Sequence, residues 1–135
     1  MINLSGKIGE MNYDGLFTSM EPAQQVHGGV IRKVTGKAVA MKRGTVLAKS
    51  SGTAGDGKLV VLGTEAGSDE TLTPDCILCD DIEVGTENDE PVAVYTAGCF
   101  DPEKVTVADE YTITESDKDA LRMRGIVFKA AAPAN

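Results

Sequence analysis

The chain has 135 residues, of which 41% are hydrophobic and 25% charged, so a single domain with a packed core is expected and global disorder is not expected. Its formal net charge is −8, and such a charge repels the phosphate backbone of nucleic acids. Aromatic residues make up only 4%, so few of the large side chains that line small-molecule pockets are present. No apolar run approaches the roughly 20 residues that a membrane span needs. Neither nucleic acid nor a membrane is therefore expected as a partner.

Residues 1–27 are expected to form an N-terminal arm or extended lead-in. Large apolar residues are scattered through this stretch without helical or strand periodicity, and Asn12, Gly15 and Pro22 interrupt any regular element. Apolar side chains in an irregular segment need another surface to cover them. We therefore predict that the arm contacts a partner, and the candidate contact residues are Leu4, Ile8, Tyr13, Leu16 and Phe17. The alternative interpretation is an ordinary frayed terminus.

Residues 28–135 are expected to form a single β-rich domain. Short runs rich in β-branched residues alternate with turn residues, which is typical of strands. The runs cover residues 30–34, 38–41, 45–48, 59–62, 76–79 and 91–95. Their close spacing leaves no room for crossover helices, so the pattern favours antiparallel pairing in a mainly β domain.

One or two short helices are expected near the C-terminus. Asp101 can cap a helix that starts at the proline that follows it. Ser116 can cap a second helix over residues 117–124, which has acidic residues in its first turn and arginines in its last. Gly125 stands where a left-handed terminator belongs, and residues 126–128 are predicted to form a closing strand.

The glycine-rich residues 52–58 have the spacing of a phosphate-binding loop but lack two of its parts. Leu59 stands where that motif needs a serine or threonine to hold Mg²⁺, and an apolar β run follows instead of a helix. A hairpin loop is therefore the favoured interpretation.

The three cysteines, Cys76, Cys79 and Cys99, cannot all pair within one chain, which favours reduced and mostly buried thiols. Cys76 and Cys79 have the spacing of a redox or zinc pair, but residues three apart on a strand point to opposite faces. The chain has one histidine, His27, so a zinc site would lack ligands. We expect structural cysteines, no metal and no cofactor.

Two carboxylate clusters, residues 80–83 and residues 89–90, could be cast as catalytic pairs. Both lie beside turns rich in glycine or asparagine, where charged side chains are normally solvated. A nucleophile, a base and an orienting acid cannot be assembled convincingly around a single histidine. The chain is therefore not expected to be an enzyme.

Five segments, in order, carry a resemblance to a known family: AMKRGTVL (40–47), GKLV (57–60), CILCDD (76–81), VYTAGCF (94–100) and DALRMRGI (119–126). Their order and rough spacing resemble the head decoration proteins of tailed bacteriophages, the family of the lambda head decoration protein D. The resemblance covers most of the chain, whereas residues 1–35 depart from the family by their length.

The resemblance implies a β-clip-like fold and a homotrimer that binds the major capsid protein on the outer surface of the expanded phage head and stabilises the shell. It also implies synthesis in the cytoplasm of the host bacterium and a final location on the virion. The five candidate arm residues then become candidate capsid contacts. The alternative belongs to another class, a small β-rich module that binds a sugar or another ligand. Against it stands the scarcity of Trp and Tyr, which stack on sugar rings.

Overall fold

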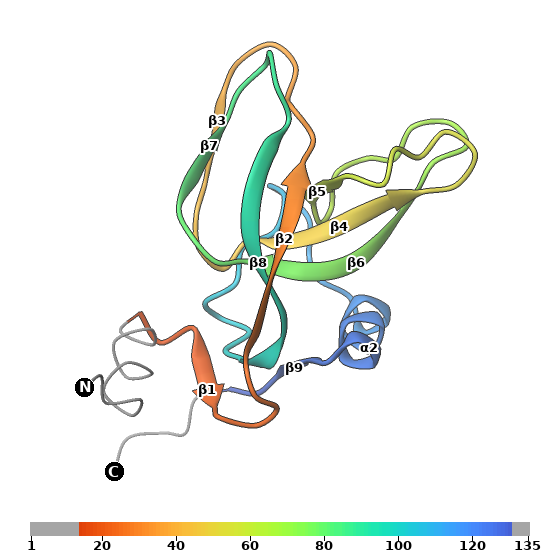
Figure 1. Cartoon of the computed structure of the whole chain (residues 1–135). Helices are drawn as coiled ribbons and strands as arrows, with labels where there is room; N and C mark the ends of the chain where they lie inside the picture. Colours follow the sequence, from red (N-terminus) through yellow and green to blue (C-terminus); the bar gives the residue numbers. More distant parts are fainter. Residues whose placement is uncertain (1–13, 131–135) are drawn as a thin grey trace.

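The computed structural model describes residues 14–130, and within them the chain is mainly β, which confirms the predicted fold class (Figure 1). The elements in chain order are β1 (Phe17–Ser19), β2 (Gln25–Ile31), β3 (Val39–Met41), β4 (Val46–Ser51), β5 (Leu59–Val61), β6 (Thr71–Leu78), β7 (Ile82–Val84), β8 (Glu90–Phe100), α2 (Glu115–Arg124) and β9 (Ile126–Phe128). Each of the six predicted β runs overlaps one of these strands.

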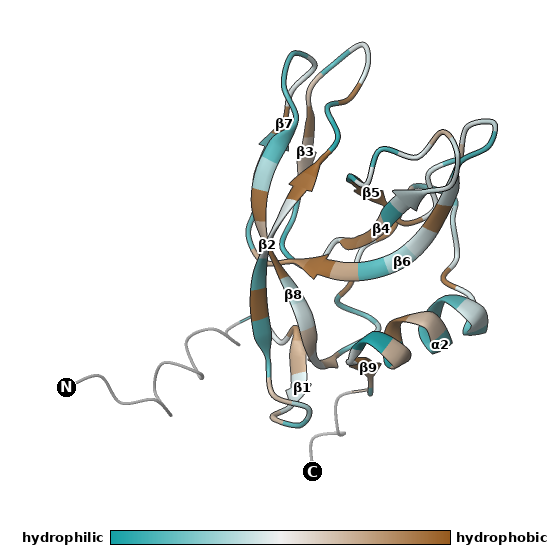
Figure 2. Ribbon diagram, turned by 45° about the vertical axis from the view of Figure 1, so that its right-hand side comes forward, coloured by the Kyte–Doolittle hydropathy of each residue, from teal (hydrophilic) through white to brown (hydrophobic). Residues whose placement is uncertain are grey.

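Five of the strands close into a ring. Strand β8 pairs with β2, β2 with β5, β5 with β4, β4 with β6, and β6 returns to β8. Strands β1 and β9 pair with the C-terminal part of β8, and β3 and β7 form a separate two-stranded sheet at the opposite end of the molecule (Figures 1 and 2). Antiparallel pairs predominate as predicted, but the β2–β5 and β8–β9 pairs are parallel.

Strand β8 supplies side chains to two separate hydrophobic clusters, because neighbouring residues of a strand point to opposite faces. Tyr95 lies in the first cluster, together with Phe100 and Leu121. Val94 lies in the second cluster, together with Ile31. Strands β4, β5 and β6 also contribute side chains to both clusters, so the core of this domain is divided into two parts that lie on opposite faces of the same strands.

Residues 14–27, which the sequence assigns to an arm, are built into the sheet. Phe17 of β1 is opposite Phe100 of β8, and β2 pairs with β8 along its whole length. Leu16 and Phe17 are only 1% and 5% exposed. The Phe17 ring lies edge-on to Tyr95, with the ring centres 4.9 Å apart, and 4.8 Å from the centre of the Phe100 ring. This is a correction, since residues 1–13 alone are left to form an arm.

Helix α2 starts two residues earlier than predicted, because Thr114 rather than Ser116 is its N-cap. The hydroxyl of Thr114 accepts a hydrogen bond from the Asp117 amide, and the Asp117 carboxylate accepts one from the Thr114 amide, each at 3.0 Å. Gly125 ends the helix in the left-handed conformation, with φ at 106°, as predicted.

The other predicted helix, after Asp101, is wrong. Residues 101–105 form a single turn, in which the Asp101 side chain accepts a hydrogen bond from the Glu103 amide at 2.9 Å and the chain then leaves the helical path. Across residues 14–130, no helix combines the length and apolar character needed to cross a membrane.

Replacing Phe17 by alanine is expected to lower the free energy of unfolding by about 3–5 kcal/mol, the usual effect of removing a buried aromatic ring. Denaturant unfolding followed by circular dichroism measures this change. Met20→Ala is the control in the same stretch, because the Met20 side chain is 52% exposed, and its effect is expected to stay below about 0.5 kcal/mol. Equally small effects at both positions would mean that Phe17 is not part of the core.

Candidate functional site

The five predicted contact residues fall into two groups. Leu4, Ile8 and Tyr13 lie outside the described residues. Leu16 and Phe17 are core residues, so neither side chain is available to a partner while the domain keeps this fold. Contacts by an N-terminal arm would therefore come from residues 1–13.

Arg43 fixes the point at which residues 1–13 join the domain. Its guanidinium group forms an ion pair with Asp14, with Nε and Oδ2 2.8 Å apart. The same group lies over the rings of Phe17 and Tyr95, 5.6 and 5.4 Å from their centres, and donates a hydrogen bond to the Tyr95 hydroxyl. Asp14 is in this way tied to the aromatic part of the core.

The contacts of Asp14 lower its pKa below the ordinary value for an aspartate. Partial burial on its own would raise the pKa, but the hydrogen bonds from Arg43 and from the Leu16 amide, together with the positive charge of Arg43, outweigh this effect. The charged form of Asp14 is therefore favoured in the folded protein.

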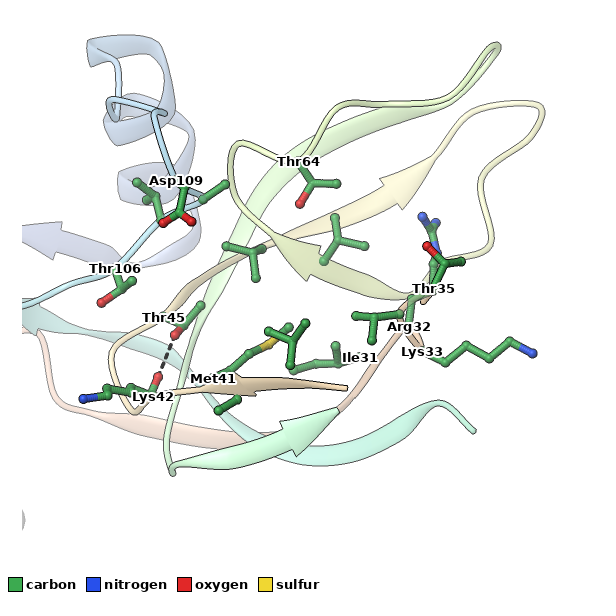
Figure 3. Close-up of a pocket in the computed structure, with 17 residues that line it drawn as sticks. Ile31, Arg32, Lys33, Thr35, Met41, Lys42, Thr45, Thr64, Thr106 and Asp109 are labelled. Atoms are coloured by element: carbon green, nitrogen blue, oxygen red, sulfur yellow. Dashed lines mark hydrogen bonds between the residues drawn. The ribbon is translucent and has the colours of Figure 1, made fainter. Parts of the chain in front are cut away.

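An open groove of about 740 Å³ lies beside β3, between that strand and the part of the chain that holds β5 and residues 106–109 (Figure 3). Ile31 and Met41 lie in the middle of this groove, whereas the amino groups of Lys33 and Lys42 point away from its centre (Figure 3). The hydroxyl of Thr45 donates a hydrogen bond to the Lys42 carbonyl at 2.6 Å. The sequence analysis did not predict this groove, because it is assembled from segments far apart in the chain.

The side chains that line the groove are mostly apolar and suit an apolar contact. Asp109 is the one carboxylate among the lining residues, which include no histidine, cysteine or aromatic residue. A catalytic set would need a base and a nucleophile within hydrogen-bonding reach of each other. Stacking on a sugar would need a ring, so the groove gives no support to the alternative of a sugar-binding module.

Carboxylates of both clusters noted in the sequence hold turns at the surface. Asp81 accepts a hydrogen bond from the Arg43 amide at 2.8 Å. Asp89 accepts one from the Lys33 amide at 2.9 Å and forms an ion pair with Lys58, with the two charged atoms 2.5 Å apart. These contacts assign a structural role to both side chains.

Residues 52–58 form the loop between the antiparallel strands β4 and β5, which confirms the hairpin interpretation. Asp56 in this loop accepts two hydrogen bonds from the Arg32 guanidinium, at 2.8 and 2.9 Å. Arg32 also contacts Glu70, whose pKa is lowered to about 2 by hydrogen bonds from the Gly67 amide, Ser50 and Arg32. The loop is therefore joined to its neighbours by a network of charged side chains.

All three cysteines are buried and none forms a disulfide. Cys79 lies in the first hydrophobic cluster and Cys76 in the second, which confirms that they point to opposite faces. Burial raises the pKa of Cys79 to about 12, and it also raises the pKa of Cys76. Within residues 14–130 no cluster of His, Cys, Asp and Glu is arranged to hold a metal ion.

The family model of the bacteriophage lambda head decoration protein D matches residues 9–126 of the chain. The chain belongs to this family. The match includes every element from β1 to α2, so the resemblance seen after residue 40 is confirmed and extends toward the N-terminus. Residues 1–8 alone precede the match, so the departure from the head decoration family is shorter than expected.

The head decoration family comprises structural proteins of the phage capsid, and the match supports a role in capsid decoration for this chain. No individual curated protein matches the sequence.

The Asp14→Asn variant is expected to be less stable than the wild type at pH 7 by about 1 kcal/mol or less, because the ion pair is only partly buried. Since the pKa of Asp14 is lower in the folded than in the unfolded protein, this contribution is complete above about pH 5 and disappears as the pH falls below about 4. Urea denaturation between pH 3 and pH 7 measures the difference. Asp80→Asn, at an exposed carboxylate, is the control, and a difference that grows toward low pH would contradict the ion pair.

Iodoacetamide is expected to leave all three cysteines of the folded protein largely unmodified at pH 8, because all three are buried and the raised pKa values of Cys76 and Cys79 leave these two little thiolate. Cys79 should react before Cys76, since it is 7% exposed and Cys76 is fully buried. Mass spectrometry of the labelled protein measures the order of reaction, and labelling in guanidinium chloride is the control. Stoichiometric zinc in the purified protein would contradict the structural role of the cysteines.

Proposed function

We propose that this protein binds the outer surface of the expanded phage head as a homotrimer, contacts the major capsid protein and stabilises the shell. The observation that carries this proposal is the match to the head decoration family over residues 9–126. The protein acts through its surfaces and performs no catalysis in this role. It is synthesised in the cytoplasm of the host bacterium and ends on the outside of the virion.

Multivalent attachment explains how such a small domain can stabilise a shell. A trimer presents three identical surfaces, which meet three equivalent positions around a local three-fold axis. Once one copy is bound, the effective concentration of the other two is high, so weak single contacts together give strong attachment. Capsid subunits joined in this way resist separation under the pressure of packaged DNA.

Residues 1–13 supply the capsid contact in this proposal, with Leu4, Ile8 and Tyr13 as the contact residues. The ion pair between Arg43 and Asp14 sets where this arm starts, and 13 extended residues span up to about 43 Å. Burial of the apolar side chains against the shell offsets the ordering of the backbone, which costs about 1–2 kcal/mol per residue. An arm that adds a strand to a sheet of the capsid protein uses backbone hydrogen bonds and needs little sequence specificity.

The purified protein is expected to bind expanded shells that lack it and to raise the temperature at which those shells come apart. Co-sedimentation measures the binding, cryo-electron microscopy locates the protein on the shell, and light scattering during heating measures shell stability. Unexpanded shells are the control for the state of the capsid. Absence of binding to expanded shells would refute the proposed function.

The double variant Leu4→Ser with Ile8→Ser is expected to bind shells at least about tenfold more weakly, because two apolar contacts of about 1 kcal/mol or more each are lost. The control is Asn3→Ser with Asn12→Ser, which changes two polar residues of the same segment and should bind like the wild type. Both proteins should unfold at the same denaturant concentration as the wild type. Unchanged binding of the Leu4/Ile8 variant would place the capsid contact on the folded domain instead.

A further inference from the structure

Strands β2 and β8 present a face without charged side chains. Residues Gln25–Ile31 and residues 91–100 contain no Asp, Glu, Lys or Arg, although a quarter of the whole chain is charged. Residues directly opposite each other in an antiparallel pair share a face, and in this ladder Gly28 is opposite Ala93 and Val30 is opposite Pro91. We call the surface formed by Val26, Gly28, Val30, Pro91 and Ala93 the β2–β8 face.

The β2–β8 face is exposed at Val26, Gly28, Val30 and Pro91, whereas at Ala93 it packs against the first hydrophobic cluster, which Tyr95, opposite Val26, also enters. Val26 and Val30 are 52% and 41% exposed, Gly28 and Pro91 are exposed, and Ala93 is half-buried. Strands β2 and β8 run between the end of the molecule that carries β1 and β9 and the end formed by β3 and β7 (Figures 1 and 2). The side chains of Val26 and Val30 are therefore exposed to solvent on either side of Gly28.

No contact within residues 14–130 explains why position 28 is a glycine. Its backbone does not adopt the left-handed conformation, and a Cβ atom added to it would meet no atom within 4 Å. Gly29 differs, since its added Cβ would lie 2.9 Å from a methyl group of Leu59. A glycine inside a strand weakens the strand and often marks the close approach of another backbone. The absent side chain at position 28 therefore leaves room that no residue between 14 and 130 fills.

The edge of β2 beside this face is also largely unpaired. On that edge β2 pairs with β5 at Ile31 alone, and no other described strand lies beside the remainder of β2. Exposed strand edges are usually protected from association by Lys or Pro, and Gln25–Ile31 contains neither. The exposed edge and the apolar face together provide a surface that another chain can approach closely.

A second copy of this chain fits the β2–β8 face on grounds of charge and position. Two copies that each carry a net charge of −8 repel each other, so their contact is least unfavourable where neither acids nor bases lie. In the proposed function the molecule meets the shell through residues 1–13, which join the domain next to β1. The β2–β8 face, which lies between the two ends of the molecule, is then turned toward neighbouring copies.

We propose that copies of this protein associate through the β2–β8 face, with part of the neighbouring copy packed over Gly28. The inference rests on the proposed function for the number of copies, which is three. Three-fold closure requires that this face meet a different surface of the next copy. The contact itself is set by the apolar side chains of Val26 and Val30 and by the space above Gly28.

The test replaces Gly28 by glutamate. The substituted side chain would enter open space, so the domain is expected to fold, but a carboxylate would lie in the middle of the contact. Gly85→Glu is the matched control, because Gly85 also has a backbone outside the left-handed region and no atom within 4 Å of an added Cβ, and it lies outside the β2–β8 face. Both variants change the net charge equally. Circular dichroism and denaturant unfolding verify that both are folded.

Light scattering and sedimentation of the full chain over a range of concentrations measure association. The wild type and Gly85→Glu are expected at three times the chain mass of 14.2 kDa. For Gly28→Glu we expect the concentration of half-assembly to rise by about 30-fold or more, which corresponds to about 4 kcal/mol per trimer, because the dissociation constant of a trimer varies with the square of this concentration. If Gly28→Glu does not fold, Val26→Lys makes the same test at a side chain that is already exposed.

Two outcomes would overturn the inference: a wild type that stays monomeric at every concentration, or a folded Gly28→Glu variant that assembles like the wild type. Shell binding by the wild type is measured in parallel and separates this inference from the proposed function. If the wild type forms trimers that Gly28→Glu weakens but does not bind shells, the inference is supported and the proposed function is refuted. If the protein binds shells but Gly28→Glu leaves its trimers unchanged, the proposed function is supported and the inference is refuted.

Discussion

Strand β8 pairs with β1, β2, β6 and β9, and its alternate side chains enter both hydrophobic clusters of the domain. A shift of its register by one residue would exchange Val94 and Tyr95 between the two clusters and disrupt both. The whole chain has only six Phe and Tyr residues, and the rings of Phe17, Tyr95 and Phe100 meet at this strand. Packing around β8 therefore replaces the large aromatic core that the composition does not provide.

Different parts of the remaining surface have different roles. Carboxylates at the turns, such as Asp56 and Asp89, are engaged with basic side chains and backbone amides. The ion pair of Arg43 with Asp14 sets the start of the N-terminal segment beside the aromatic rings. The groove beside β3 and the β2–β8 face remain as apolar surfaces that no other part of residues 14–130 covers. A protein organised in this way is suited to binding other proteins.

The sequence predicts strands correctly where local composition determines the structure, as in the β-branched runs. It fails where contacts between distant segments determine the structure. Leu16 and Phe17 were assigned to an arm because β1 has three residues, too few to show a period, and its partner strand lies far along the chain. The sequence does not predict strand β7, because its three residues follow two aspartates. Thr114 and Ser116 can both cap a helix, and the position of Asp117 favours Thr114. The groove and the β2–β8 face could not be predicted, because each depends on which segments become neighbours.

The pairing of β1 with β8 also affects how the protein is made. Thr18 and Cys99 contact each other but stand 81 positions apart, and β9 comes later still. At a synthesis rate of about 5–20 residues per second, the ribosome needs about 4–16 s to add those 81 residues. Throughout that interval Leu16 and Phe17 have no strand to cover them. The domain must therefore close late in translation, after β8 and β9 have been synthesised.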